Sequence, residues 1–127
     1  MVSEQQKILI VEDDTFLMNL LSLKLRKEQF DVVQAFDGLE AMEKLKEIRP
    51  RLILLDLILP KKNGFEILQE IGQDPQMKTI PIIIISNLGQ EADIERGKGL
   101  GAVEYFVKAR LSIDDLIAKV KEFVAKA

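Results

Sequence analysis

The chain of 127 residues contains no cysteine and no histidine. Without cysteine it can form neither a disulfide bond nor a thiolate metal site. Without histidine it can use neither imidazole catalysis nor a phosphohistidine intermediate of its own. If phosphohistidine takes part in the chemistry of this protein, a partner protein must carry it.

Long apolar segments and clusters of basic residues are missing as well. The longest apolar runs, such as residues 82–85, are far shorter than the roughly 20 residues of a membrane-spanning helix. The 18 lysines and arginines are spread along the chain, and the formal net charge is -3. Residues 1–7 contain no apolar signal segment. We therefore expect a cytoplasmic protein with no membrane insertion and no direct nucleic-acid contact.

The length of the chain fits one domain that covers residues 1–127. A chain of this size removes roughly two thirds of its unfolded surface from water, which is enough for a hydrophobic core. The sequence has no internal repeat, no low-complexity tract and no linker rich in proline, glycine or serine. The missing linker favours a protein that consists of this domain alone.

Short aliphatic runs alternate with longer amphipathic stretches, as in βα units wound around a parallel sheet. Five strands are predicted, at residues 8–11, 31–35, 52–55, 80–85 and 104–107. The third and fourth are apolar throughout and belong in the centre of the sheet. Five helices are predicted, at residues 15–28, 39–48, 64–73, 90–100 and 113–125. The pattern predicts an α/β fold with a doubly wound, five-stranded parallel sheet.

The helix predicted at residues 90–100 contains two glycines. Gly97 and Gly99 each cost about 0.8 to 1 kcal/mol relative to alanine in a helix interior. Such glycines either make the helix mobile or relieve close packing, and both readings stay open here.

Four acidic residues follow two of the predicted strands. Glu12, Asp13 and Asp14 come after the first strand, and Asp56 comes directly after the third. The ends of parallel strands meet at one edge of the sheet, where open α/β sheets bind ligands. Crowded carboxylates repel one another unless a cation joins them, and their hard oxygens suit Mg2+. Asp14 is better explained as a helix cap than as a metal ligand.

A hydroxyl and an ammonium group are predicted at the same edge. Ser86 ends the fourth strand and Lys108 ends the fifth. A carboxylate nucleophile with a metal ion, a lysine and a hydroxyl around it can carry out phosphoryl transfer. Each residue alone has a simpler explanation, as a cap or as a solvated charge, so the inference depends on the combination.

Two motifs and a set of spacings point to one family. Residues 8–14 read ILIVEDD, and residues 54–60 read LLDLILP. Further positions agree in type and spacing: Asn63, Gly64, Ser86, Gly101, Ala102, Tyr105 and Lys108. Over essentially its whole length the chain resembles the response-regulator receiver domain of bacterial two-component systems. The resemblance implies the flavodoxin-like receiver fold with strand order 2-1-3-4-5, and together with the missing linker we expect a single-domain regulator.

The resemblance implies a metal site and a phosphoacceptor. Asp56 would accept the phosphoryl group and bind Mg2+ or Mn2+. Asp13 would bind the same ion directly, Glu12 through water, and Ile58 through its backbone carbonyl.

The resemblance also implies a switch. Lys108 and Ser86 would stabilise the phosphoryl oxygens, and Tyr105 would move inward as Ser86 is drawn toward Asp56. The surface formed by residues 90–100, 104–107 and 113–125 would then change and control a downstream protein target.

The implied phosphoryl donor is a sensor histidine kinase or a histidine phosphotransfer protein. The protein would not be an enzyme, apart from Mg2+-dependent self-phosphorylation and dephosphorylation at Asp56. The main alternative is a receiver-like binding module that signals without phosphorylation. An FMN-binding flavodoxin is disfavoured, because Glu12, Asp13 and Asp14 would repel its phosphate. An aspartyl phosphatase would need a second aspartate at the position of Ile58.

Three residues depart from the family pattern. Ala109 stands where the family usually has a proline after the lysine, so a trans Lys108–Ala109 bond and a shifted loop are expected. Ile58 and Asn87 lie at the mouth of the site and could restrict water, which predicts slow loss of the phosphoryl group.

The first predicted helix carries more apolar residues than one face needs. Leu17, Leu20, Leu21 and Leu25 form the stripe that would face the sheet. Phe16, Met18 and Leu23 lie beyond it and predict either a docking site for a kinase or phosphotransfer domain, or additional core packing.

Overall fold

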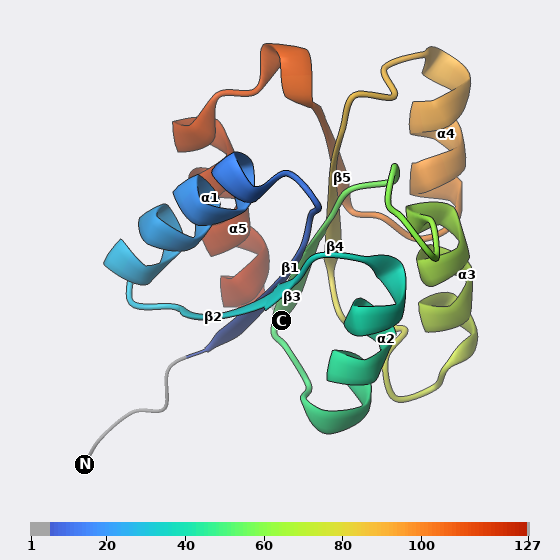
Figure 1. Cartoon of the computed structure of the whole chain (residues 1–127), viewed down its shortest axis with the longest axis horizontal. Coiled ribbons are helices and arrows are strands. Elements are labelled where there is room, and N and C mark those ends of the chain that lie inside the picture. Colours follow the sequence, from blue (N-terminus) through green and yellow to red (C-terminus); the bar gives the residue numbers. More distant parts are fainter. Residues whose placement is uncertain (1–5, 127) are drawn as a thin grey trace.

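Five strands form one parallel sheet in the computed structural model, in which residues 6–126 are described. The strands lie in the order β2-β1-β3-β4-β5 (Figure 1). Their bounds are β1 Lys7–Val11, β2 Asp31–Ala35, β3 Leu52–Leu55, β4 Ile82–Ser86 and β5 Glu104–Val107. The predicted fold class and strand order are confirmed.

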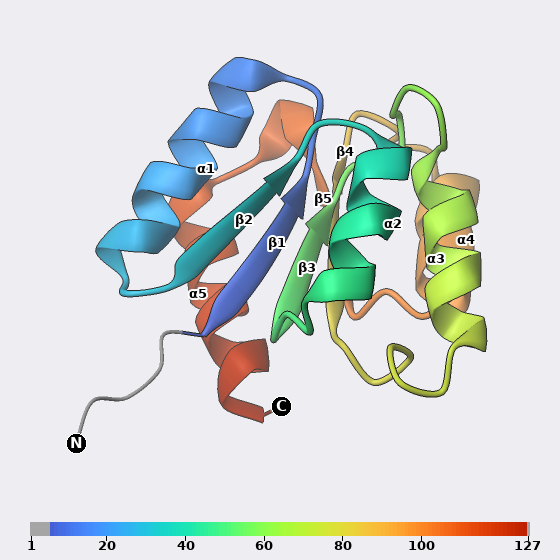
Figure 2. The same cartoon turned by 60° about the horizontal axis from the view of Figure 1, so that its bottom comes forward.

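The helices cover both faces of this sheet. The segments α1 and α5 lie on one face, and α2, α3 and α4 lie on the other (Figures 1 and 2). Their bounds are α1 Thr15–Lys27, α2 Gly38–Glu47, α3 Gly64–Gln73, α4 Glu91–Gly99 and α5 Ile113–Lys126. Among the residues that the structure describes, no helix is long and apolar enough to span a membrane.

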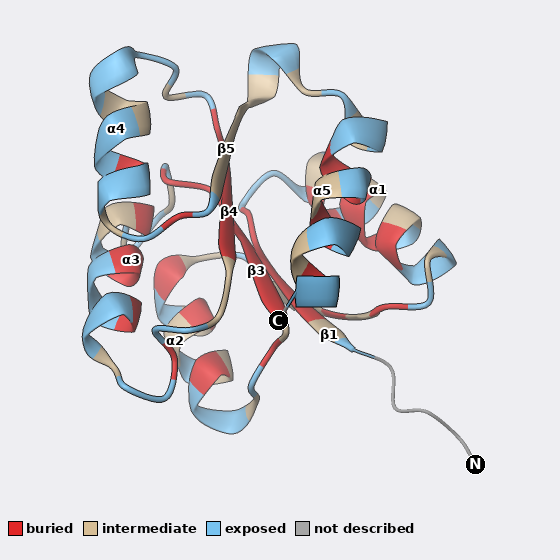
Figure 3. Cartoon of the chain, turned by 180° about the vertical axis from the view of Figure 1, so that it is seen from behind, coloured by how far each residue is buried: buried red, intermediate tan, exposed pale blue. Residues whose placement is uncertain are grey.

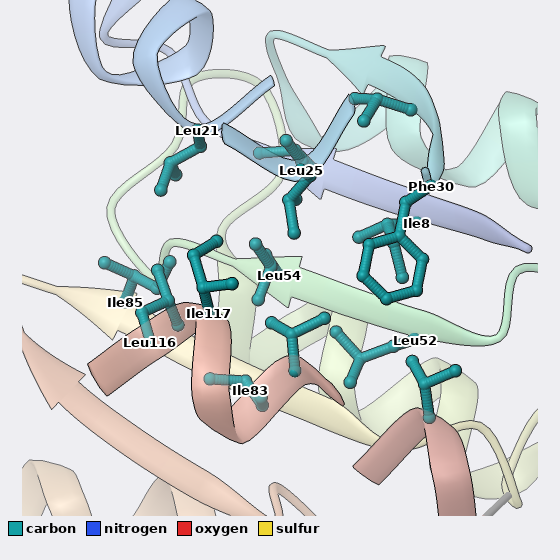
Figure 4. Close-up of a cluster of buried hydrophobic side chains, with 14 of the residues drawn as sticks. Ile8, Leu21, Leu25, Phe30, Leu52, Leu54, Ile83, Ile85, Leu116 and Ile117 are labelled. Carbon is teal, nitrogen blue, oxygen red and sulfur yellow. The ribbon is translucent and has the colours of Figure 1, made fainter. Parts of the chain in front are cut away.

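Alternate residues of the strands enter two separate cores. Ile8 and Ile10 of β1 pack under α1 and α5, in the cluster that Figure 4 shows with Leu21 and Ile117. Leu9 of β1 belongs to the core under α2 and α3. All residues of β3 and β4 are buried (Figure 3). A shift of one residue would exchange the two faces, so this packing fixes the register and thereby the strand ends that carry the polar residues.

The fourth strand begins two residues later than predicted and ends one residue later. It starts at Ile82 because the proline at position 81 lacks the N–H that a central strand must donate. The carbonyl of Pro81 still accepts a hydrogen bond from the N–H of Ile53 at 3.0 Å. At the other end, β4 extends one residue beyond the predicted range and includes Ser86.

The two glycines of α4 differ in their surroundings. A Cβ at Gly97 would lie 2.6 Å from Cδ1 of Ile84 and 3.3 Å from the ring of Tyr105. A Cβ at Gly99 would meet nothing within 4 Å. Close packing therefore explains Gly97, whereas it gives no reason for Gly99. The helix itself is one residue shorter at each end than predicted.

The structure corrects part of the interpretation of the first helix. Met18 is completely buried and belongs to the core under α1 and α5, so it cannot form part of a docking surface. Phe16 is 79% exposed and Leu23 is 53% exposed. Asp14 caps α1 by accepting a hydrogen bond from the N–H of Leu17 at 3.1 Å. The surplus apolar surface of α1 thus consists of Phe16 and Leu23.

Candidate functional site

Three carboxylates meet at the carboxyl ends of β1 and β3. Glu12 and Asp13 follow β1, and Asp56 follows β3. Glu12 and Asp56 are only 2% and 3% exposed, whereas Asp13 is exposed. One carboxylate oxygen from each residue lies within 4.8 Å of the others. The predicted acidic cluster is therefore confirmed as an arrangement in space.

Backbone hydrogen bonds continue the sheet one residue beyond the two strands. The N–H of Glu12 donates to the carbonyl of Ala35, and the N–H of Asp56 donates to the carbonyl of Val11, both at 3.0 Å. These bonds extend the hydrogen-bonding pattern of the sheet through the backbone of both acids. The side chains therefore project from a rigid edge rather than from a free loop.

Backbone N–H groups also orient the two buried carboxylates. Oε2 of Glu12 accepts a hydrogen bond from the N–H of Asp14 at 2.9 Å. Oδ1 of Asp56 accepts one from the N–H of Ile58 at 3.1 Å. Each carboxylate keeps its other oxygen for a second partner.

That second partner is Lys108, the residue directly after β5. Its Nζ lies 2.7 Å from Oδ2 of Asp56 and 2.7 Å from Oε1 of Glu12. Burial lowers the pKa of Lys108. Its hydrogen bonds to the two carboxylates raise the pKa by more than that, so the net result lies above the ordinary value. Lys108 therefore stays a cation at physiological pH. Its contact with Asp56 was expected, and its equal contact with Glu12 was not.

Burial changes the acidity of Glu12. Removal from water raises its pKa from 4.5 to about 7, and the charge of Asp56 acts in the same direction. The hydrogen bonds from Lys108 and from the N–H of Asp14 lower the pKa without cancelling that rise. The buried carboxyl of Glu12 therefore keeps its proton to a higher pH than a glutamate in water does.

The donor set fits a divalent cation. Carboxylate oxygens are hard ligands, which suit ions such as Mg2+, Mn2+ and Ca2+. Lys108 supplies one positive charge for two buried acids and the exposed Asp13. A second cation would relieve the remaining repulsion and would favour the charged form of Glu12.

Ser86 and Tyr105 are linked through the backbone of Leu88. Oγ of the buried Ser86 accepts a hydrogen bond from the N–H of Leu88 at 3.3 Å. The hydroxyl of the half-buried Tyr105 donates to the carbonyl of the same Leu88. Burial, and then the charge of Asp93, raises the pKa of Tyr105. The residue type of Leu88 does not indicate that it links Ser86 to Tyr105, because its backbone N–H and carbonyl, and not its side chain, make the two contacts.

The segment after Lys108 agrees with one expectation from the sequence. No cis peptide bond occurs in the described residues, so the Lys108–Ala109 bond is trans as predicted. Residues Lys108–Arg110 form a short 3-10 helix.

The two residues predicted at the mouth of the site are both open to solvent. Ile58, two residues after Asp56, is 52% exposed. Asn87 is exposed as well.

Known proteins share both this sequence pattern and this fold. The family described as response regulator receiver domain matches residues 8–121. The DNA-binding dual master transcriptional regulator RpaA of Synechocystis is 33% identical over 120 residues, which cover 94% of this chain and 49% of RpaA. The phosphate regulon transcriptional regulatory protein PhoB of Rhizobium meliloti is 37% identical over 121 residues, covering 95% and 53%. The chain spans about half the length of these curated relatives.

A solved structure agrees with these relatives. The Mn2+-bound form of response regulator Rcp1 is 36% identical, with a TM-score of 0.79 over 92% of this chain and 90% of that chain. Receiver domains bind a divalent metal in an acidic pocket and interact with histidine kinases or phosphotransfer proteins. The chain belongs to the response regulator receiver domain family, the phosphoacceptor signalling modules of two-component systems.

Proposed function

We propose that this chain accepts a phosphoryl group on Asp56 in a Mg2+-dependent reaction and thereby controls a downstream protein. The observation that carries the proposal is the position of Asp56. This buried carboxylate lies 2.7 Å from an ammonium group and belongs to a cluster of acidic oxygens that suits a metal ion. Because the chain has no histidine, the phosphohistidine donor is a sensor histidine kinase or a histidine phosphotransfer protein.

The metal site consists of residues from two strand ends. Asp13 and Asp56 would bind Mg2+ directly, Glu12 would bind through water, and Ile58 would contribute its backbone carbonyl. When bound, the ion supplies positive charge beside the oxygens of the transferred phosphoryl group. The oxygen donor set supports this assignment.

The chain's own residues carry out the transfer by positioning and charge. An oxygen of Asp56 forms a bond to phosphorus while the P–N bond of the donor phosphohistidine breaks and the imidazole leaves. Lys108 neutralises negative charge on the phosphoryl oxygens, since its Nζ already lies at Asp56. The hydroxyl of Ser86 accepts a bond from Leu88 and keeps its own hydrogen for a phosphoryl oxygen.

The switch connects this site to the face formed by α4, β5 and α5. Movement of Ser86 toward the phosphoryl group acts on Leu88, and through Leu88 on Tyr105. On the same face, Glu104 of β5 lies 4.0 Å from Lys98 of α4 and 3.8 Å from Lys119 of α5. A displacement of β5 would therefore also change the charge pairing that the downstream protein meets.

The relatives suggest the kind of pathway. RpaA and PhoB are named as transcriptional regulators and are about twice as long as this chain. The net charge of -3 without a basic cluster indicates that the present residues contact protein partners rather than nucleic acid. A cytoplasmic location is part of the same proposal.

Intact mass spectrometry tests the proposal. The protein is incubated with Mg2+ and acetyl phosphate, beside an Asp56→Asn variant and a sample treated with EDTA. We expect one phosphoryl adduct in the wild type and none in either control. If no phosphodonor gives an adduct on the wild type, the chain is a binding module that works without phosphorylation.

A further inference from the structure

The loop between β3 and α3 rests on the first turn of α2. Residues 57–63 form this loop, which lies beside the start of α2 (Figure 2). A Cβ on Gly38, the first residue of α2, would lie 1.9 Å from the carbonyl oxygen and 2.5 Å from Cβ of Lys62. Both atoms belong to or adjoin the loop backbone, so no rotation of a flexible side chain could make room. Only glycine permits this contact between helix and loop.

Two polar contacts join the same surfaces. The N–H of Gly38 donates to the carbonyl of Pro60 at 3.3 Å. Nζ of Lys61 lies 3.4 Å from Oδ2 of Asp37. Asp37 is itself held in place, because its side chain caps α2 by accepting from the N–H of Glu40 at 2.8 Å. The start of α2 therefore contacts three consecutive loop residues, Pro60, Lys61 and Lys62.

The other side of the loop is tied to the phosphoacceptor. The N–H of Ile58 donates to Oδ1 of Asp56 at 3.1 Å, and the N–H of Gly64 donates to the carbonyl of Leu57 at 3.0 Å. A Cβ on Gly64 would lie 2.5 Å from the carbonyl oxygen of Asp56. Both ends of the loop thus pack against backbone, which limits how far a displacement at Gly38 can be absorbed within the loop. The displacement would reach Ile58.

We infer that Gly38 is a positioning residue for the metal site, acting through the loop that presents the carbonyl of Ile58. This inference rests on the proposed function, in which that carbonyl is a metal ligand. Gly38 does not touch the metal site itself. Its contribution is to let α2 approach closely enough to fix the position of the loop that follows Asp56.

Isothermal titration calorimetry with MgCl2 tests the inference on the whole chain. Gly38→Ala adds one methyl group, and we expect it to weaken Mg2+ binding by about tenfold or more, as loss of a supporting contact does at other metal sites. Gly99→Ala is the matched control, because its Cβ meets nothing within 4 Å, and it should leave the Mg2+ affinity unchanged. Urea unfolding identifies any loss of the folded state. Equal Mg2+ affinity of folded Gly38→Ala and wild type overturns the inference.

A second measurement needs no variant and applies if Gly38→Ala fails to fold. Amide hydrogen exchange of the wild type is followed with and without Mg2+. If helix and loop move as one body, Mg2+ should slow exchange at Gly38 as well as at Ile58. Slower exchange at Ile58 with no change at Gly38 contradicts the inference and leaves the proposed function intact. A wild type that neither binds Mg2+ nor takes a phosphoryl group contradicts the proposed function itself.

Discussion

Nζ of Lys108 lies 2.7 Å from Oδ2 of Asp56, although 52 residues separate the two along the chain. The two residues follow β5 and β3, so the lysine side chain reaches across the end of β4. The same nitrogen lies 2.7 Å from Oε1 of Glu12, which follows β1. One cation thus joins the ends of three strands and pairs with two buried carboxylates.

Replacing this cation should destabilise the protein when Mg2+ is absent. Lys108→Met leaves Glu12 and Asp56 buried without their shared partner, and we expect the free energy of unfolding to fall by about 2 kcal/mol. Mg2+ should restore more stability to this variant than it adds to the wild type. Urea unfolding in EDTA and in Mg2+ measures both effects. Lys119→Met removes ion pairs with Glu104 and Glu122 that are open to solvent on the lysine side, and serves as control; an equal loss in both variants would contradict the prediction.

The raised pKa of Glu12 predicts that the metal-free protein loses stability as pH rises. Between pH 4.5 and about 7 the folded protein holds a proton on Glu12 that the unfolded chain has released. This contribution is complete below the unfolded pKa of 4.5 and disappears as pH passes about 7. Urea unfolding in EDTA at a series of pH values measures it. Glu12→Gln cannot titrate and should show a flatter dependence; an unchanged slope in this variant would assign the effect to another group.

Ile58 should slow the hydrolysis of the phosphorylated protein. Its apolar, 52% exposed side chain cannot orient an attacking water molecule. Ile58→Asn should therefore shorten the phosphoryl half-life by at least about tenfold, measured as the decay of the adduct by mass spectrometry. Val103→Asn makes the same chemical change before β5, at the opposite edge of the sheet, and should leave the half-life unchanged. A wild-type half-life of only seconds would refute the idea of slow hydrolysis.

Two neighbouring apolar residues of α1 should respond differently to truncation. Met18→Ala creates a cavity in the core and should lower the free energy of unfolding by about 2 to 5 kcal/mol. Phe16 is 79% exposed, so Phe16→Ala should change it by less than about 0.5 kcal/mol. Urea unfolding of both variants under one condition makes the comparison. Similar losses would show that Phe16 is packed in solution.

The sequence alone determined the architecture and the composition of the site. Strands β3 and β4 are apolar at positions for both faces, apart from the final Ser86, which predicts their central place. Acids after two strands and a lysine after another must meet at one edge of a parallel sheet, whatever the details of packing. For that reason the sequence predicts that Glu12, Asp56 and Lys108 lie together.

Tertiary packing decided the surroundings of residues that are chemically similar in the sequence. In α1, Phe16 and Met18 are both apolar, and only the rotation of the helix against the sheet buries one and exposes the other. In α4, Gly97 and Gly99 cost the isolated helix the same, and only the side chains of Ile84 and Tyr105 distinguish them. The contact of Gly38 with Lys62 joins segments 24 positions apart through backbone atoms. Such contacts follow from distances between chain segments, and residue types by themselves contain no information about those distances.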